Sequence, residues 1–212
     1  MVLWIDGHGK SHLFDDNGQP TAAVARLLES GRGVASADVF LTGEFVADGN
    51  ETQLPKVNDG YQGYTSGYNR PVLSNRVRDI LTTIALLSCD TNRVKSLHLV
   101  GTGTAGTWVL LARALAGKRV DQTVVDLDKF AGFESIGETS DAMFLPGALK
   151  YGGLGGLAAL AAPAKLSIYT GSGRMSLGEL SALVTAYNQT QGPLRFSTGR
   201  LERNKVVDEV LR

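Results

Sequence analysis

The sequence contains one cysteine, three histidines and no apolar run that approaches the roughly 20 residues of a membrane span. The lone Cys89 cannot form a disulfide within the chain, and its apolar surroundings "ILTTIALLSCD" predict a buried structural thiol in a reducing compartment. The first residues, "MVLWIDGHGK", include no basic region followed by a long apolar core. We therefore expect a cytoplasmic protein with no membrane partner.

An excess of charge of either sign is also missing. Twenty-one basic residues balance 21 acidic ones, so no overall field attracts nucleic acid, and we expect no nucleic-acid partner. The 212 residues, 43% of them hydrophobic and 26 of them glycine, are typical of a globular protein with many turns. This length favours a single domain over residues 1–212.

Apolar runs and helical patterns alternate along the chain. Strands are predicted at 2–6, 33–41, 96–101, 122–128, 165–171 and 194–199. Helices are predicted at 21–31, 74–89, 107–117, 152–163, 176–189 and 202–212. This alternation indicates an α/β fold, a mostly parallel sheet of about six strands with helices on both faces in a three-layer sandwich. Ligands of such sheets bind at the carboxyl ends of the strands.

Individual residues predict where some helices begin and end and which side chains lie in the core. Gly31 is expected to end the first helix, and Ser74 to cap the amino terminus of the second. Residues 42–73 form a long polar and aromatic loop, which is either a lid or binding loop or a plain surface excursion. Trp4 and Trp108 lie in apolar runs and are expected in the core.

The segment "LHLVGTGTAGTWVLLARAL" leads from a strand through a glycine turn into a helix. In one interpretation Gly101, Gly103 and Gly106 form a GxGxxG loop for a dinucleotide, and Asp126 at the end of the next strand contacts the ribose. Two strands already precede this turn, and no second nucleotide-binding half is evident. This NAD(P)-binding interpretation is the alternative.

In the other interpretation the same turn is the nucleophile elbow GxSxG of a hydrolase. The alignment places Gly103 at the serine position, so the nucleophile position is vacant. A shift of one residue offers Thr104, flanked by Thr102 and Gly106. A β-branched residue suits a strained elbow poorly.

The order of several segments carries a resemblance to a known family. These segments are "VLWIDGHGKSHLF", "VASADVFLTGEF", "GYNRPVLSNRVRDILT", "LHLVGTGTAGTWVLLARAL" and "GALKYGGLGGLAALAAP". They resemble bacterial α/β-hydrolases of the acetyl xylan esterase and dienelactone hydrolase group. The resemblance begins at the third strand of that fold, which implies a domain without the first two strands of the family.

The resemblance implies hydrolysis of carboxylic esters by a Ser, acid and His triad with an oxyanion hole. The implied oxyanion and binding loop consists of Gly7, His8, Gly9 and Lys10, with Thr102 beside the elbow. The nucleophile position falls on Gly103. The acid position after strand 165–171 offers Thr170, Gly171 and Ser172, and the histidine position after the last strand offers Ser197, Thr198, Gly199 and Arg200. The resemblance thus implies a degenerate triad.

Other candidate residues were considered for the site. His98 lies within a strand and is expected to be structural, whereas His8 or His12 could lie near the strand ends. A metal could be held by the group Asp6, His8, His12, Asp15 and Asp16. Because "DDNG" is itself a good turn and the loop defines no ligand geometry, we expect no metal site.

Charged residues near the predicted strand ends have two interpretations. Asp126 or Asp128 could be a catalytic carboxylate that orients a base, or could act as a cap or an ion-pair partner of Lys129 or Arg119. A surface or hinge network is expected for Arg70, Arg76 and Asp79.

Three functional hypotheses follow. The chain is a non-catalytic binding module that retains the pocket, an atypical hydrolase of esters or lactones, or a nucleotide-binding oxidoreductase. The atypical hydrolase would use Thr104, or a water held by His8, His12 and a carboxylate. In the first two hypotheses the partner is a small-molecule ester or lactone and no cofactor is needed. An exposed sheet edge would also favour a homodimer.

Overall fold

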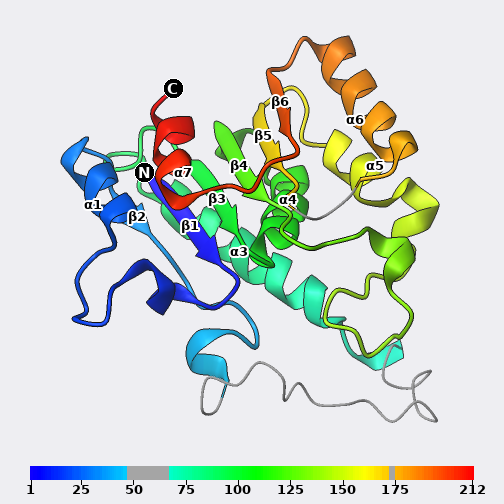
Figure 1. Cartoon of the computed structure of the whole chain (residues 1–212), viewed down its shortest axis with the longest axis horizontal. Coiled ribbons are helices and arrows are strands. Elements are labelled where there is room, and N and C mark those ends of the chain that lie inside the picture. The colour runs from blue at the N-terminus through cyan, green and yellow to red at the C-terminus, as the bar shows by residue number, and fades with distance from the viewer. Residues whose placement is uncertain (47–66, 172–174) are drawn as a thin grey trace.

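The computed structural model describes residues 1–46, 67–171 and 175–212 (Figure 1). Its centre is a sheet of six parallel strands in the order β2-β1-β3-β4-β5-β6. The strands are β1 Val2–Asp6, β2 Val34–Ala35, β3 His98–Thr102, β4 Gln122–Asp126, β5 Lys165–Tyr169 and β6 Leu194–Ser197. This confirms the predicted parallel sheet and brings the carboxyl ends of all strands to one edge.

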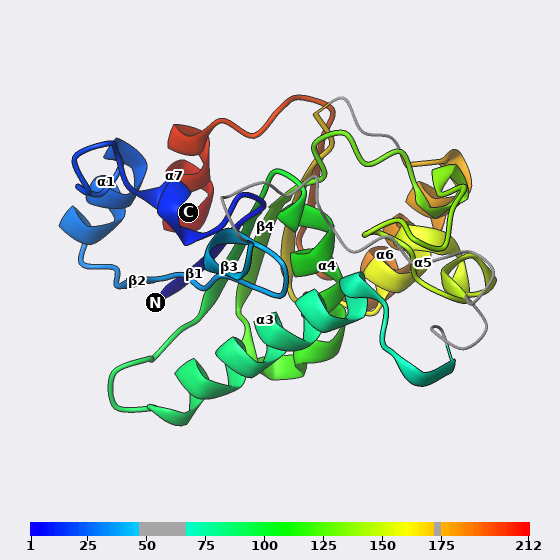
Figure 2. The same cartoon turned by 90° about the horizontal axis from the view of Figure 1, so that it is seen from below.

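Helices cover both faces of the sheet. They are α1 Ala22–Glu29, α3 Val72–Cys89, α4 Ala105–Ala116, α5 Gly153–Ala159, α6 Leu177–Thr190 and α7 Arg203–Leu211. Helices α1 and α7 pack together on one face, and α3, α4, α5 and α6 share a hydrophobic cluster with the other (Figure 2). The three-layer sandwich is therefore confirmed.

Alternation along β1 explains why two layers of helices are needed. Val2 and Trp4 belong to the cluster under α1 and α7, whereas Leu3 and Ile5 belong to the cluster under α3 and α4. All four side chains are completely buried. A strand whose successive side chains are all apolar must be covered on both faces, because neighbouring side chains point in opposite directions.

Several local predictions can be compared with the structure. Gly31, at φ +80°, follows the end of α1 as predicted, and its N–H donates to the carbonyl of Leu28. The predicted cap at Ser74 is wrong, because α3 begins at Val72, directly after Pro71. Proline suits this position because its fixed φ fits a helix start, where a missing N–H costs little. The predicted strand 33–41 shortens to Val34–Ala35.

The prediction that Cys89 is buried is also wrong. Cys89 is the last residue of α3 and is exposed. The fully buried apolar residues of this helix end at Ile84, one and a half turns earlier, so the apolar sequence continues past the part of the helix that the core covers. Trp4 and Trp108 are core residues as predicted.

Most of the predicted loop 42–73 lies outside the described residues. In the described ranges, no helix combines the length and the apolar character that crossing a bilayer requires.

Candidate functional site

The turn between β3 and α4 is a sharp bend from strand to helix. Strand β3 ends at Thr102, Gly103 adopts φ +61°, and α4 begins two residues later at Ala105. The N–H of Gly106 donates to the carbonyl of Gly103 at 3.0 Å and closes the turn. A sharp bend from strand to helix is the feature that lifts a nucleophile above the sheet in α/β-hydrolases.

Two glycines allow this turn to pack tightly. A Cβ at Gly106 would overlap the carbonyl oxygen of Asp126 on the neighbouring strand, and a Cβ at Gly101 would lie 2.7 Å from the Cβ of Val109. Gly103 differs, since the nearest atom to a Cβ there would be the amide nitrogen of Gly7 at 4.0 Å. The backbone of the elbow is therefore held rigidly, while residue 103 has room for a side chain that it lacks.

Thr104 follows Gly103 and is exposed. A Cβ at Gly7 would overlap the hydroxyl oxygen of Thr104, so the two loops approach closely only because residue 7 is glycine. The N–H of Gly7 donates to the carbonyl of Thr102 at 3.1 Å, which joins the end of β1 to the end of β3. The structure thus brings the predicted residues Gly7, Thr102, Gly103 and Thr104 together.

The backbone N–H groups of the predicted oxyanion loop have partners within the chain. Gly9 donates to the carbonyl of Asp6 at 3.0 Å, and Lys10 donates to Oδ1 of Asp38 at 2.6 Å. The Lys10 ammonium pairs with Asp38 at 3.1 Å and with Glu44 at 2.8 Å. These hydrogen bonds, to Glu44 first and then to Asp38, raise the pKa of Lys10. An oxyanion at this loop would have to compete with existing acceptors.

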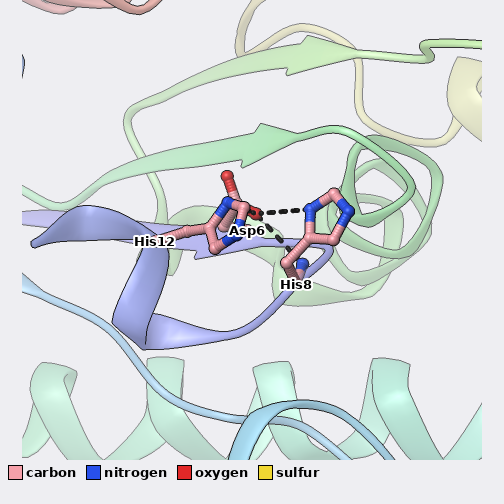
Figure 3. Close-up of side chains that lie close together, drawn as sticks. All are labelled: Asp6, His8 and His12. Atoms are coloured by element: carbon pink, nitrogen blue, oxygen red, sulfur yellow. Dashed lines mark hydrogen bonds and ion pairs between the residues drawn. The ribbon is translucent and has the colours of Figure 1, made fainter. Parts of the chain in front are cut away.

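Asp6, His8 and His12 form a compact cluster directly after β1 (Figure 3). Oδ1 of Asp6 lies 3.4 Å from Nδ1 of His8 and 3.6 Å from Nδ1 of His12. The two imidazole rings stack with centroids 4.5 Å apart and an interplanar angle of 14°. The sequence placed these residues in one loop, but the meeting of both rings at one carboxylate oxygen is a finding of the structure.

The buried Asp6 carboxylate is held from the opposite side. The Thr102 hydroxyl donates to Oδ2 of Asp6 at 2.8 Å, and the Trp4 indole N–H donates to the same hydroxyl at 2.9 Å. Arg203 approaches Oδ2 of Asp6 at 4.0 Å and Nδ1 of His12 at 3.5 Å. Sequence reasoning missed Trp4 and Arg203 as supports, since no local pattern links them to Asp6.

Asp15 and Asp16, the other acids considered for a metal, belong to the neighbouring turn rather than to this cluster. Oδ1 of Asp15 accepts the N–H groups of Asn17 and Gln19 at 2.9 and 2.8 Å. The turn expected from "DDNG" is therefore present.

Asp126 lies at the end of β4 and is almost completely buried. Its Oδ1 accepts the N–H of Asp128 at 2.9 Å, and its Oδ2 accepts the N–H of Leu201 at 3.2 Å. Burial raises the pKa of this carboxyl group, because the charged form is costly away from water. Backbone capping, one of the two roles expected for Asp126, is the role that these contacts describe.

His98 and Arg76 stabilise the structure away from the strand ends. His98 is buried, its Nδ1 lies 3.2 Å from Oε1 of Gln122 and its Nε2 lies 2.7 Å from Arg32, as expected for a structural histidine. Burial, followed by the charge of Arg32, lowers its pKa. Arg76 is also buried, with its guanidinium 4.1 Å from the ring centroid of Trp108. The surface part of the expected surface or hinge network is therefore wrong for this residue, and the hinge stays a prediction.

Two of the cavities in the described part of the chain differ in character. One, of about 560 Å³, opens beside the loop after β1, and His8, Lys10, His12, Phe14 and Glu44 are among its lining residues. The other, of about 480 Å³, is an apolar groove between α3, α4 and α5. The first cavity joins the histidine cluster to solvent and is the better candidate for a ligand site.

Neither protein-family models nor the curated proteins yield a match to the sequence. Solved structures do match. A protein assigned as an acetyl xylan esterase from Bacteroides fragilis aligns with 92% of this chain and 57% of its own, at a TM-score of 0.67 and 13% identity. The chain has an α/β-hydrolase-like fold.

Other solved structures share this fold. A protein assigned as a dienelactone hydrolase from Klebsiella pneumoniae aligns with 99% of this chain and 83% of its own, at a TM-score of 0.53 and 12% identity. A methylesterase aligns with 98% of this chain and 47% of its own, at a TM-score of 0.60 and 16% identity. The chain thus spans less than two thirds of the acetyl xylan esterase and of the methylesterase.

The dinucleotide-binding alternative is not favoured. The carboxylate of Asp126, the expected ribose contact, is buried and hydrogen-bonded to the backbone at both oxygens. A ribose hydroxyl would have to displace one of these hydrogen bonds.

Proposed function

We propose that this α/β-hydrolase-fold chain binds a small-molecule ester or lactone without hydrolysing it by a Ser, acid and His triad. The observation that carries the proposal is Gly103 at the apex of the β3 to α4 turn, where a hydrolase presents its nucleophile. Glycine supplies no hydroxyl. The geometry of the elbow is therefore retained while the reacting group is missing.

The residues around the turn support the same proposal. The hydroxyl of Thr104 packs against Gly7, and the hydroxyl of Thr102 donates to Asp6. Thr170 and Gly171 follow β5, where the acid would lie, and the residues from Ser197 to Arg200, where the histidine would lie, include no imidazole. A hydroxyl is a poor nucleophile without a base within hydrogen-bonding distance.

The ligand class follows from the fold and the cavity. The cavity beside the loop after β1 has the volume of a small-molecule site, and polar groups of His8 and Ser11 line it together with the apolar ring of Phe14. Carbonyl compounds such as esters and lactones combine an apolar body with oxygen acceptors that such donors can bind.

A hydrolysis assay tests the proposal directly. The untagged chain, in buffer containing a chelator, should hydrolyse a short-chain nitrophenyl ester and an aliphatic lactone at the rate of buffer alone. An esterase with an intact triad provides the positive control. Hydrolysis that is lost in Thr104→Ala or His8→Ala would contradict the proposal and assign an atypical hydrolase.

A binding measurement completes the test. Titration of the same ester into the 15N-labelled chain should shift the amide signals of His8, Ser11 and Phe14, which line the cavity, in a saturable manner. The amide of Gly178, in α6, is the internal reference. Unchanged spectra at millimolar ester would refute ester binding at this edge of the sheet.

The homodimer expected from an exposed sheet edge stays a prediction. Light scattering, which measures the molar mass in solution, tests it.

A further inference from the structure

We propose that Asp6, His8 and His12 bind a divalent transition-metal ion, for which zinc has the best-matched ligand preference. The inference is independent of ester binding, because it depends only on the last side chain of β1 and two side chains of the loop that follows. Two imidazole nitrogens and one carboxylate oxygen are ligands that zinc accepts readily, whereas magnesium and calcium prefer oxygen ligands.

The distances between the ligand atoms fit one metal ion. Zinc bonds of about 2.0–2.1 Å in a tetrahedral arrangement separate neighbouring ligand atoms by about 3.4 Å. Oδ1 of Asp6 lies 3.4 Å from Nδ1 of His8 and 3.6 Å from Nδ1 of His12. The possible ligand atoms of all three residues lie within 4.8 Å of one another. The two separations from Asp6 thus match a tetrahedral zinc site, and binding would require the exposed imidazole rings to turn until their nitrogens reach the same separation.

The imidazole rings of His8 and His12 can rotate to complete a tetrahedral arrangement of ligands. Their side chains are 63% and 46% exposed, so each ring can turn until its nitrogen points at the ion. In Figure 3 both rings lie next to the Asp6 carboxylate, and they come from adjacent parts of one short loop. Little ordering of the chain is needed on binding.

Asp6 is positioned as the fixed ligand of the site. Its side chain is only 7% exposed, and its Oδ2 is occupied by the Thr102 hydroxyl at 2.8 Å. That hydroxyl in turn accepts the N–H of the buried Trp4 indole at 2.9 Å. Outer hydrogen bonds of this kind orient a metal-binding carboxylate. Here Oδ1 faces the two imidazoles and also accepts the backbone N–H of His8 at 3.0 Å.

The positive charge of Arg203 repels a cation at this site. Its guanidinium lies 4.0 Å from Oδ2 of Asp6 and 3.5 Å from Nδ1 of His12. The Arg203 side chain is 44% exposed and can withdraw from His12 into solvent. Its positive charge lowers the affinity for a cation, so we expect a site of moderate strength.

The proposed metal site is open to solvent and has fewer than four protein ligands. His8 and His12 line the cavity of about 560 Å³, which provides an entry path. Three protein ligands leave a fourth tetrahedral position for water or for an oxygen atom of a bound molecule.

Calorimetric titration tests the proposal with zinc itself. The untagged chain, freed of metal by a chelator and then dialysed, should bind one Zn²⁺ per chain, and Mg²⁺ should give no signal. His8→Ala and His12→Ala should each weaken binding at least tenfold, and the double variant should abolish it. Both side chains are largely exposed, so these variants should remain folded, which circular dichroism checks.

Asp16→Asn is the matched control, because it removes a carboxylate from the same loop but outside the cluster. It should leave the affinity for Zn²⁺ unchanged. Asp6→Asn keeps an oxygen that can accept from Thr102 but removes the charge, and it should weaken binding at least tenfold. Co²⁺ should give the intense visible absorption of a tetrahedral complex, and this absorption should be lost in the double variant.

Two outcomes would overturn the proposal. One is the absence of stoichiometric Zn²⁺ binding by the wild-type chain, and the other is equal affinity in the wild type and the double histidine variant. Neither measurement involves an ester. A failure of the metal site is therefore distinguishable from a failure of the proposed ester binding.

Discussion

The carboxylate of Asp126 accepts a hydrogen bond from the N–H of Leu201 at 3.2 Å, and so joins the end of β4 to the loop after β6. In an α/β-hydrolase the loop after the last strand carries the histidine of the triad. Here the carboxylate that reaches this loop meets a peptide N–H. The contact fixes the loop, and burial raises the pKa of the acid.

Replacing Asp126 with alanine tests this structural role. The N–H groups of Asp128 and Leu201 would lose their acceptor, and we expect the free energy of unfolding to fall by about 1–3 kcal/mol. Urea unfolding gives the measurement. Asp208→Ala, which removes an exposed ion pair with Arg26, is the control and should cost less than about 1 kcal/mol. Unchanged stability with loss of ester binding would assign Asp126 to the site instead.

Introducing a hydroxyl at the elbow tests the role of the missing base. Gly103→Ser should fold, because a Cβ there has space, but it should lose about 1–2 kcal/mol since Gly103 has φ +61°. Nitrophenyl ester hydrolysis should stay at the buffer rate, because the loop after β6 supplies no imidazole. Hydrolysis that appears in Gly103→Ser and disappears in Gly103→Ser with His8→Ala would show that His8 can act as a base.

The close packing of the elbow predicts a contrast between two glycines. Gly106→Ala should lower the free energy of unfolding by about 3 kcal/mol or more, because the new Cβ would overlap the carbonyl oxygen of Asp126. Gly178→Ala, in the first turn of α6 with open space around it, should instead raise it by about 0.5–1 kcal/mol. Thermal unfolding of both variants checks the contrast, and equal effects would refute the packing argument.

The hydrogen bonds of the Glu209 carboxylate make the stability of the fold depend on pH in the acid range. Burial alone would raise its pKa, but hydrogen bonds from Tyr169, Arg195 and Ser167 outweigh burial and hold the pKa below the ordinary value of 4.5. A carboxyl group with a lowered pKa in the folded state stabilises the protein above pH 4.5, and this contribution is lost as the pH falls through the folded-state pKa.

Glu209→Gln should therefore reduce the dependence of the free energy of unfolding on pH below about 4.5. Urea unfolding between pH 3 and pH 6 measures the effect. Glu202→Gln is a matched control, because it changes an exposed glutamate just before α7. If Glu209→Gln and the wild type have parallel profiles, the hydrogen-bonded carboxylate does not govern acid stability.

Much of the fold could be predicted from local sequence patterns. Apolar strands such as 2–6 and 122–126, helical periodicity and the position of Gly31 were sufficient for the alternation and the parallel sheet. The glycines at 101, 103 and 106 indicated a sharp strand-to-helix turn. These features depend on residues that are neighbours in sequence, and backbone preferences act over the same short range.

The sequence by itself determined the order of strands and helices, the glycine turn at 101–106 and the absence of a serine at residue 103. Only the tertiary structure decided that Cys89 is exposed and that the imidazoles of His8 and His12 face one oxygen of Asp6. It also decided that the Trp4 indole donates to the Thr102 hydroxyl, 98 residues away, which in turn donates to the other Asp6 oxygen, Oδ2. Likewise it decided that Asp126 accepts the N–H of Leu201, 75 residues away. Such contacts depend on how the sheet brings distant strand ends together, and no periodicity within a segment records them.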